Sequence, residues 1–327
     1  MLQYTVRRIL LMILTVWIIS IISFVVIQLP PGDYLTTLAI NLEESGYPVE
    51  EAMLERYRTR FGLDKTMFEQ YVIWITNFVQ GDMGYSFEWR ANVNTLIWER
   101  LLLTIALSTS SLILTWMISL PIGIYSALRQ HSLGDYAFTI LGLMGISVPS
   151  FMLALVLMYV AFNTFGLDVG RLFSPEYEDA SWSFGKVLDL LKHIWLPGFI
   201  IAISGTAGLI RTLRANLLDE LKKPYMITAR SKGVAYRKVV MKYPMRIAMN
   251  PFISSFAYIL PGLISFSAII SVVMNMPTTG PLLLGALQTQ DMYLAGSFIM
   301  LLSALTVIGT FFSDLLLAAV DPRVRFF

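Results

Sequence analysis

The residues of this 327-residue chain that could carry covalent chemistry are few and widely spaced. Cysteine is absent, which excludes disulfides, thiolate metal sites and a cysteine nucleophile, and the only histidines are His131 and His193. The sequence has no G-x-x-x-x-G-K-[ST] phosphate loop and no G-x-G-x-x-G dinucleotide fingerprint. We therefore expect a chain that is not an enzyme, with no catalytic residue, no metal site and no cofactor. If a nucleotide drives it, hydrolysis must occur on a partner.

The composition explains this scarcity, because the chain is too apolar for a soluble protein. Apolar residues make up 56% of it, charged residues only 14%, and the mean hydropathy is +0.66. Soluble proteins carry roughly a quarter charged residues. A soluble enzyme, a nucleic-acid-binding domain and a disordered scaffold are therefore excluded, and the composition predicts an integral membrane protein.

Six uncharged stretches predict six transmembrane helices, since a helix needs about 20 mostly apolar residues to cross a bilayer. These stretches are residues 9–31, 101–128, 136–167, 193–210, 247–274 and 292–313. No A-x-A-like cleavage site follows the first, so we interpret it as a retained span rather than a signal peptide. The third is longer than one crossing and must tilt, overshoot or bend at Pro149. The break at residues 277–281, with two prolines and a glycine, is expected to end the fifth.

The positions of lysine and arginine predict how these helices are oriented. If the N-terminus is cytoplasmic, the inner segments carry 15 of the 24 basic residues, and the outer segments carry nine bases with 17 acids. The only acids of the inner segments are Asp135, Asp219, Glu220 and Asp321. This asymmetry predicts that both termini are cytoplasmic.

Two soluble segments lie between the predicted helices. Residues 32–100 form an extracytoplasmic segment with an amphipathic pattern (Met53, Leu54, Tyr57 and Phe61), and its aromatic part, residues 68–79, is expected on the membrane surface. The other is a basic cytoplasmic loop, residues 211–246. The predicted divisions are thus 1–31 (N-terminus and first helix), 32–100, and a five-helix core 101–327 that includes this loop.

The basic loop has the punctuation of a short projecting helix. Pro224 suits the first turn of a helix and Gly233 its end, which predicts a two-turn helix over 225–232 and a second helix beginning near Ala235. The first helix would fit a groove on a cytoplasmic partner and present Tyr225, Thr228, Ala229 and Lys232. A polybasic loop lying against anionic membrane lipid is the alternative.

This loop resembles the EAA loop of permease subunits in binding-protein-dependent ABC importers, in the version typical of the dipeptide/oligopeptide family. The pattern Tyr-x-x-Thr-Ala-Arg-Ala-Lys-Gly is matched by Tyr225, Thr228, Ala229, Arg230, Lys232 and Gly233, with Ser231 in place of an alanine. Other motifs of the family are matched in order by Tyr4, Arg7, Arg8, Pro31, Gly32, Asp33, Gly62, Leu63, Asp64, Gln70, Tyr71, Trp74, Gly81, Asp82, Gly84, Ser86, Ser147, Pro149, Phe151, Arg211, Arg214, Asp314, Asp321, Pro322 and Arg323.

The resemblance implies an all-α integral membrane protein with the six transmembrane helices of type I ABC importers. An extracytoplasmic segment would separate helices 1 and 2, and the six EAA-loop residues would couple the chain to its ATPases between helices 4 and 5. The implied partners are a homologous second permease, two ABC ATPase subunits that bind ATP and Mg, and an extracellular or periplasmic substrate-binding protein, with no nucleic acid. The implied location is a bacterial or archaeal plasma (inner) membrane, with lipid around a multi-pass chain.

The substrate stays open between peptides and oligosaccharides. The family often has Glu-Thr-x-Phe-x-x-Pro-Gly-Leu-Gly near the fifth span, where this chain has Ser271, Val272, Met274 and then residues 277–280. Nickel is disfavoured because cysteine is absent and histidine scarce. A stand-alone secondary transporter or channel would need buried ionisable residues along its pathway. The spans offer little besides Asp314, for which a structural ion pair is the expected role.

Hydroxyl side chains mark a candidate translocation pathway. Ser254, Tyr258 and Ser265 share one helical face of the predicted fifth span and could line a wet cavity. The alternative is that they hold helices together by hydrogen bonds. In that case we expect the pathway around Ser147 and Ser150.

Overall fold

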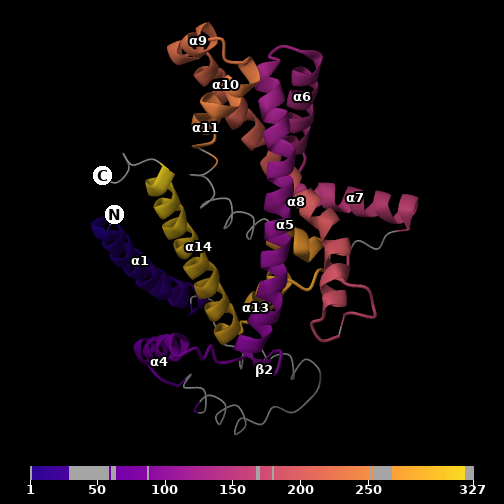
Figure 1. Cartoon of the computed structure of the whole chain (residues 1–327). Helices are drawn as coiled ribbons and strands as arrows, with labels where there is room; N and C mark the ends of the chain where they lie inside the picture. Colours follow the sequence, from indigo (N-terminus) through magenta and orange to yellow (C-terminus); the bar gives the residue numbers. More distant parts are fainter. Residues whose placement is uncertain are drawn as a thin grey trace. The chain divides into compact units, whose positions relative to one another are not determined.

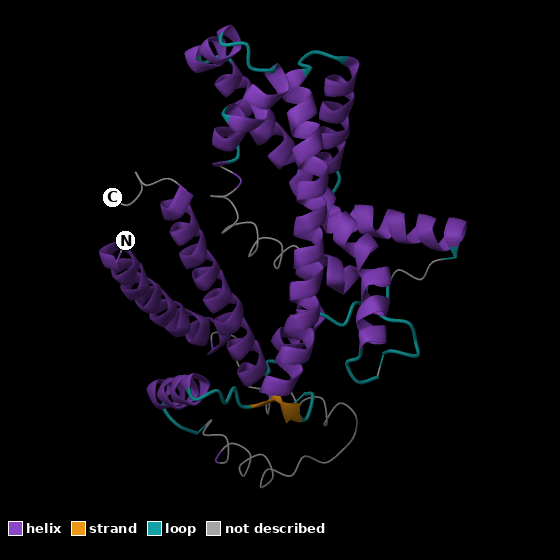
Figure 2. Ribbon diagram, in the orientation of Figure 1, coloured by secondary structure: helices purple, strands orange, loops and turns teal. Residues whose placement is uncertain are grey.

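The computed structural model describes residues 2–28, 59, 64–86, 88–166, 170–178, 180–250, 252 and 267–320. These residues are predominantly helical, with one short antiparallel pairing of β1 (Tyr85–Ser86) and β2 (Ala91–Asn92) (Figure 2). The helices are α1 (Leu2–Gln28), α4 (Met67–Val79), α5 (Val93–Leu128), α6 (Leu133–Ser147), α7 (Ser150–Phe165), α8 (Phe184–Leu221), α9 (Pro224–Ser231), α10 (Tyr236–Lys242), α11 (Pro244–Ala248), α13 (Thr279–Gln288) and α14 (Met292–Val320) (Figure 1). The predicted all-α class is confirmed, with the two-residue pairing as a small addition.

Five of the six predicted spans coincide with helices that could cross a membrane. Within the described residues, α1, α5 and α14 are each long and apolar enough. Two bent pairs could each form one further span: α6 with α7, at 104°, and the two halves of α8, at 55°. The predicted fifth span, residues 247–274, lies largely outside the described residues.

The long third stretch bends at its proline, which is one of the three ways predicted to accommodate its length. α6 ends at Ser147, and Val148 is extended with φ −91° and ψ 124°. Proline disfavours helical geometry in the residue before it, and it fits the start of a helix because it needs no donor there. Pro149 therefore ends α6 and caps the N-terminus of α7.

The predicted break at residues 277–281 is also present, although residues 279–281 belong to α13. Residues 267–273 are helical, and α13 begins at Thr279 after a non-helical connection. Gly280 and Pro281 lie in the first turn of α13, where proline is tolerated because its missing N–H would have no helical partner.

The described residues form two compact units: those within 104–276 and 309–320 belong to the first, and those within 2–103 and 277–308 belong to the second. In the first unit, α6, α7 and α11 all pack on α8. Glycines on α6 permit its close approach: a Cβ at Gly145 would lie 3.0 Å from Cγ2 of Ile203, and one at Gly142 would lie 3.2 Å from Cβ of Ala207.

The core of the first unit lies beneath the basic loop. Its buried members are Ala127, Leu213, Leu217, Met245, Ala248 and Phe252. The Trp116 ring packs edge-on against Phe252 with 6.4 Å between centroids. Because this cluster joins α5, α8 and α11, it anchors the helices of the basic loop.

In the second unit, α4 packs on α1 through aromatic side chains. Phe24, Trp74 and Met300 form its buried centre, and the Ser20 hydroxyl lies 2.9 Å from the Tyr71 hydroxyl. Thr66 and Glu69 close a capping box at the start of α4, which fixes where the helix begins. The aromatic segment expected over residues 68–79 is therefore helical, and its position on the membrane surface stays a prediction.

A buried carboxylate at the start of α14 organises the same unit. Asp291 is fully buried and accepts hydrogen bonds from the Ser86 hydroxyl at 2.6 Å and the Leu294 N–H at 3.2 Å. The Ser297 hydroxyl donates to the Met83 carbonyl at 3.1 Å. Gly84 has a φ of +89°, and a Cβ at this position would come within 2.6 Å of the Tyr293 ring. We call Asp291, Ser86 and the groups bonded to them the Asp291 cluster; it fixes residues 83–92 against α14.

Candidate functional site

The basic loop folds into three short helices that follow α8 (Figure 1). α8 continues to Leu221, and α9 begins at Pro224, one residue before the predicted start, and ends at Ser231. Ala235 is the N-cap of α10. The predicted two-turn helix and the second helix beginning near Ala235 are both confirmed.

Gly233 ends α9 in the way its position predicts. Its φ is +75°, a left-handed conformation that side chains other than glycine adopt at a cost. Its N–H donates to the Arg230 carbonyl at 2.9 Å and closes the last turn. A Cβ built at this position meets no atom within 4 Å, so the need for glycine is conformational and not steric.

The inner face of α9 packs on α10. Met226 is buried with Val239 and Val240, and Tyr225 and Ala229 are partly buried against them. The sequence predicts Tyr225 and Ala229 on the presented face, whereas the structure shows both partly buried against α10, and their role in coupling stays a prediction. They turn inward because the apolar pair on α10 lies on their side of α9.

The outer face of α9 presents an aliphatic side chain surrounded by polar and basic ones. Ile227 is 68% exposed, and its exposed neighbours include Thr228, Ser231 and Lys232. The Arg230 guanidinium lies over the Tyr236 ring, 5.5 Å from its centroid. Ile227 was not among the predicted coupling residues. The sequence did contain a signal for Ile227, because it is an isoleucine within a basic, hydroxyl-rich helix of a soluble loop.

A buried glutamate fastens α9 to the last turn of α8. Glu220 is 6% exposed and accepts hydrogen bonds from the Lys223 ammonium and, at 2.7 Å, from the Tyr225 hydroxyl. Burial, together with the hydrogen bond to this carboxylate, raises the pKa of the Tyr225 phenol, so Tyr225 stays protonated and donates. The orientation of α9 therefore depends on Glu220 as well as on Met226.

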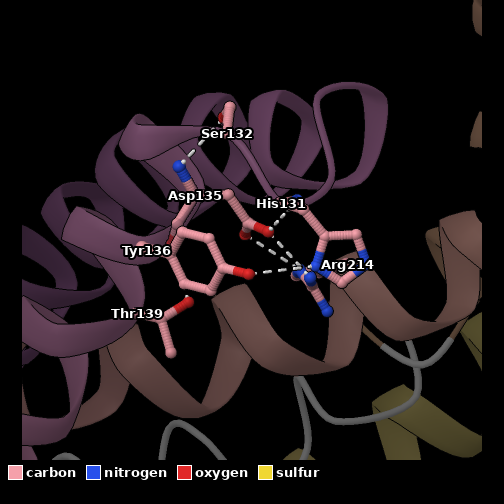
Figure 3. Close-up of polar contacts among 6 residues, drawn as sticks. All are labelled: His131, Ser132, Asp135, Tyr136, Thr139 and Arg214. Carbon is pink, nitrogen blue, oxygen red and sulfur yellow. Dashed lines mark hydrogen bonds and ion pairs between the residues drawn. The ribbon is translucent and has the colours of Figure 1, made fainter.

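A second buried acid joins α6 to α8 (Figure 3). Arg214 donates from Nε to Oδ1 of Asp135 at 3.0 Å and from Nη2 to Oδ2 at 2.8 Å. Oδ2 also accepts from the His131 N–H at 3.0 Å, and the Ser132 hydroxyl caps α6 by accepting from the Asp135 N–H. The sequence singled out Arg214 as a motif residue, but Asp135 entered only the charge count. Its isolation among basic inner segments was the available signal.

The predicted pathway residues fall partly outside the described chain. Ser147 ends α6 with an exposed side chain that donates to the Leu143 carbonyl at 2.8 Å, and Ser150 begins α7 half-buried. The structure thus places both at the Pro149 break. Ser254, Tyr258 and Ser265 lie outside the described residues, as do Pro31, Gly32, Asp33, Asp321, Pro322 and Arg323, so these predictions stay open.

Other candidate sites are limited in the described part of the chain. No group of three or more His, Cys, Asp or Glu side chains there could hold a metal ion. His193 lies 3.6 Å from Oδ1 of Asp189, and His131 lies 3.4 Å from the Tyr136 hydroxyl. Asp314 is half-buried on α14, and its role as a structural ion pair stays a prediction.

Comparison with known proteins accounts for this arrangement. Residues 119–326 match the family described as "Binding-protein-dependent transport system inner membrane component", and residues 1–108 match its N-terminal counterpart. The chain belongs to this family. It is 32% identical over 327 residues to the oligopeptide transport system permease protein AppB of Bacillus subtilis, with all of both chains covered. It is 29% identical over 326 residues to the glutathione transport system permease protein GsiC of Escherichia coli K12, again with both chains fully covered.

Membership of this family confirms the resemblance that the EAA loop indicated. The chain is a multi-pass, inner-membrane permease of a binding-protein-dependent ABC importer, and it works with ABC partner subunits and a binding protein. The permease is a non-catalytic membrane subunit without a cofactor of its own, because ATP hydrolysis in such a system occurs on separate subunits.

Proposed function

We propose that this permease translocates dipeptides and oligopeptides that an extracellular or periplasmic binding protein delivers. The names of its full-length relatives support peptides as the cargo, since one relative is an oligopeptide permease and the other carries glutathione, itself a small peptide. Oligosaccharides are the second candidate, because the chain departs from the family motif near the fifth span at Ser271, Val272 and Met274.

The outer face of α9 is the observation that carries the mechanism. α9 is held by Glu220 at its start and by Met226 along its inner face, and it presents Ile227 outward. We infer that α9 docks into a groove on one of two ABC ATPase subunits, which bind ATP and Mg. When the ATPases close on ATP, they displace α9, and α8 transmits this motion as alternating exposure of a cavity shared with a homologous second permease.

The orientation of the permease follows from its charges. With both termini cytoplasmic, α9 lies on the cytoplasmic side, where ATPase subunits can reach it, and residues 32–100 lie outside, where a binding protein can. The excess of lysine and arginine in the inner segments supports this orientation.

Labelling of introduced cysteines tests the orientation in a chain that has none of its own. Ser181 and Ser231 are both exposed and lie in soluble segments on opposite predicted sides. In intact cells, an impermeant thiol reagent is expected to label Ser181→Cys and to label Ser231→Cys only after the membrane is permeabilised. Labelling of Ser231→Cys in intact cells would overturn both the orientation and the docking of α9.

Transport by the reconstituted complex tests the cargo. The permease, its second permease, the ATPases and the binding protein are placed in proteoliposomes, and uptake of a labelled peptide panel and an oligosaccharide panel is measured with and without ATP. We expect ATP-dependent accumulation of peptides. Accumulation of oligosaccharides alone would favour the second candidate, and uptake without ATP or binding protein would favour a stand-alone transporter or channel.

A further inference from the structure

We propose that the Asp135–Arg214 pair is a positioning latch, which transmits the displacement of α9 to α6 and so couples ATP hydrolysis to transport. This inference rests on the proposed function of α9. The latch consists of two hydrogen bonds, of 3.0 and 2.8 Å, between the carboxylate at the start of α6 and the guanidinium on α8 (Figure 3). A bidentate pair of this kind fixes both distance and direction, which a single contact does not.

The burial of Asp135 makes the latch rigid. Its side chain is 3% exposed and that of Arg214 is 28% exposed, so the carboxylate has given up most of its water. A buried charge is costly unless paired, whereas an apolar pair of similar size would often serve stability as well. Directional contact between α6 and α8 is what the ion pair adds here.

A continuous helix connects the latch to α9. Glu220, which holds Tyr225, follows Arg214 by six residues on α8, or roughly 9 Å along the helix axis. Leu217, between these two residues, and Leu213, just before Arg214, are fully buried in the core beneath the loop. A displacement of α9 therefore acts on Glu220, and the continuous helix α8 transmits it to Arg214.

On the α6 side of the latch, local hydrogen bonds hold the turn that contains Asp135. The His131 N–H donates to the same carboxylate, with His131 at φ +63°, and the Ser132 hydroxyl caps the helix. Thr139 donates from its hydroxyl to the Asp135 carbonyl at 2.7 Å (Figure 3). A shift of Arg214 would consequently carry this turn and the first turns of α6 together.

Beyond the latch, α6 meets α8 through small residues. Gly142 faces Ala207 and Gly145 faces Ile203, so α6 contributes no side chain of its own to these two contacts. Helices pack by fitting ridges of side chains into grooves, and glycine contributes no ridge at these two positions. α6 can thus pivot on α8 about a polar attachment at one end, which moves Ser147 and the Pro149 break at the other.

Isosteric substitution separates a latch from a merely structural contact. Asp135→Asn, Arg214→Lys and the control Asp219→Asn, at an exposed acid of the same α8 segment, are reconstituted with the partner subunits. Peptide uptake, substrate-stimulated ATP hydrolysis and thermal unfolding are measured for each. We expect uptake per ATP to fall about tenfold in Asp135→Asn with hydrolysis largely retained, to fall less in Arg214→Lys, and to stay unchanged in the control.

Two results would overturn the latch alone. One is an unchanged ratio of uptake to hydrolysis in both latch variants while the wild type transports normally. The other is a loss of uptake and hydrolysis in proportion to lost folded protein, which would make the pair structural; Arg214→Lys, which keeps the charge, decides this if Asp135→Asn does not fold. A wild type that accumulates nothing with ATP would overturn the proposed function, and the latch with it.

Discussion

Replacement of Ile227 by aspartate is expected to reduce substrate uptake more than thirtyfold while the permease still inserts into the membrane. Ile227 is the exposed aliphatic side chain on the outer face of α9, and docking would bury it in the ATPase groove. Central apolar anchors of an interface contribute about 2–4 kcal/mol, and a buried, unpaired carboxylate adds a penalty of its own. Since each 1.4 kcal/mol is about a factor of ten, the loss of ATPase binding would be severe.

The measurement is co-purification of the ATPases with the permease, followed by uptake in proteoliposomes. Ile227→Leu serves as the matched control, because it keeps the apolar volume and is expected to retain both binding and uptake. The aspartate should leave the fold intact, since the side chain it replaces contacts solvent rather than Met226 and the α10 valines. Normal uptake by Ile227→Asp would show that α9 does not dock through this face.

The existence of α9 could be predicted from the sequence, but the face it presents could not. Pro224 and Gly233 punctuate the chain locally, and each acts through its own backbone geometry. Which side of the helix turns inward depends on Val239 and Val240 of α10. That contact is tertiary, so the residues of α9 alone do not predict that Tyr225 and Ala229 are partly buried.

The membrane spans could also be predicted from local signals, although the helix of the predicted fourth span is longer than its apolar stretch. Hydropathy located residues 193–210, whereas α8 runs from Phe184 to Leu221. The apolar stretch marks the part of the helix that can cross the bilayer, whereas the capping residues determine where the helix begins and ends. Its N-cap is Ser183, which accepts from the Lys186 N–H at 3.2 Å. Pro149, by contrast, acts locally and marked the bend between α6 and α7 correctly.

The roles of the buried acids Asp135 and Asp291 could not be predicted from the sequence. Arg214 lies 79 positions after Asp135 and Asp291 lies 205 after Ser86. The sequence shows each acid as one more charge in a segment, and no local rule names a partner so far away. Only their burial in the structure distinguishes them from solvated carboxylates such as Asp219.

Replacement of Asp291 by leucine is therefore expected to destabilise the second unit strongly. The change leaves the buried Ser86 hydroxyl and the Leu294 N–H without their acceptor, and each lost acceptor costs about 1–3 kcal/mol. The bond from the Leu294 N–H is also the one that caps the start of α14, so the loss of the cap is already included. We expect a total of about 2–6 kcal/mol, seen as a lower unfolding temperature of the purified permease and faster proteolysis of residues 83–92.

Two variants make this expectation specific. Asp291→Asn keeps an oxygen for the Leu294 N–H and is expected to lose only part of the stability, whereas Glu99→Leu removes an exposed acid of the same unit and should cost little. Equal stability of Asp291→Leu and Glu99→Leu would mean that the Asp291 cluster does not hold the segment in place. Asp291 matters because the segment it anchors also packs Gly84 against the Tyr293 ring, where a Cβ would come within 2.6 Å. The Ser297 hydroxyl bonds the same segment at the Met83 carbonyl, so the loss of Asp291 leaves this bond to hold the segment against α14 together with the glycine packing.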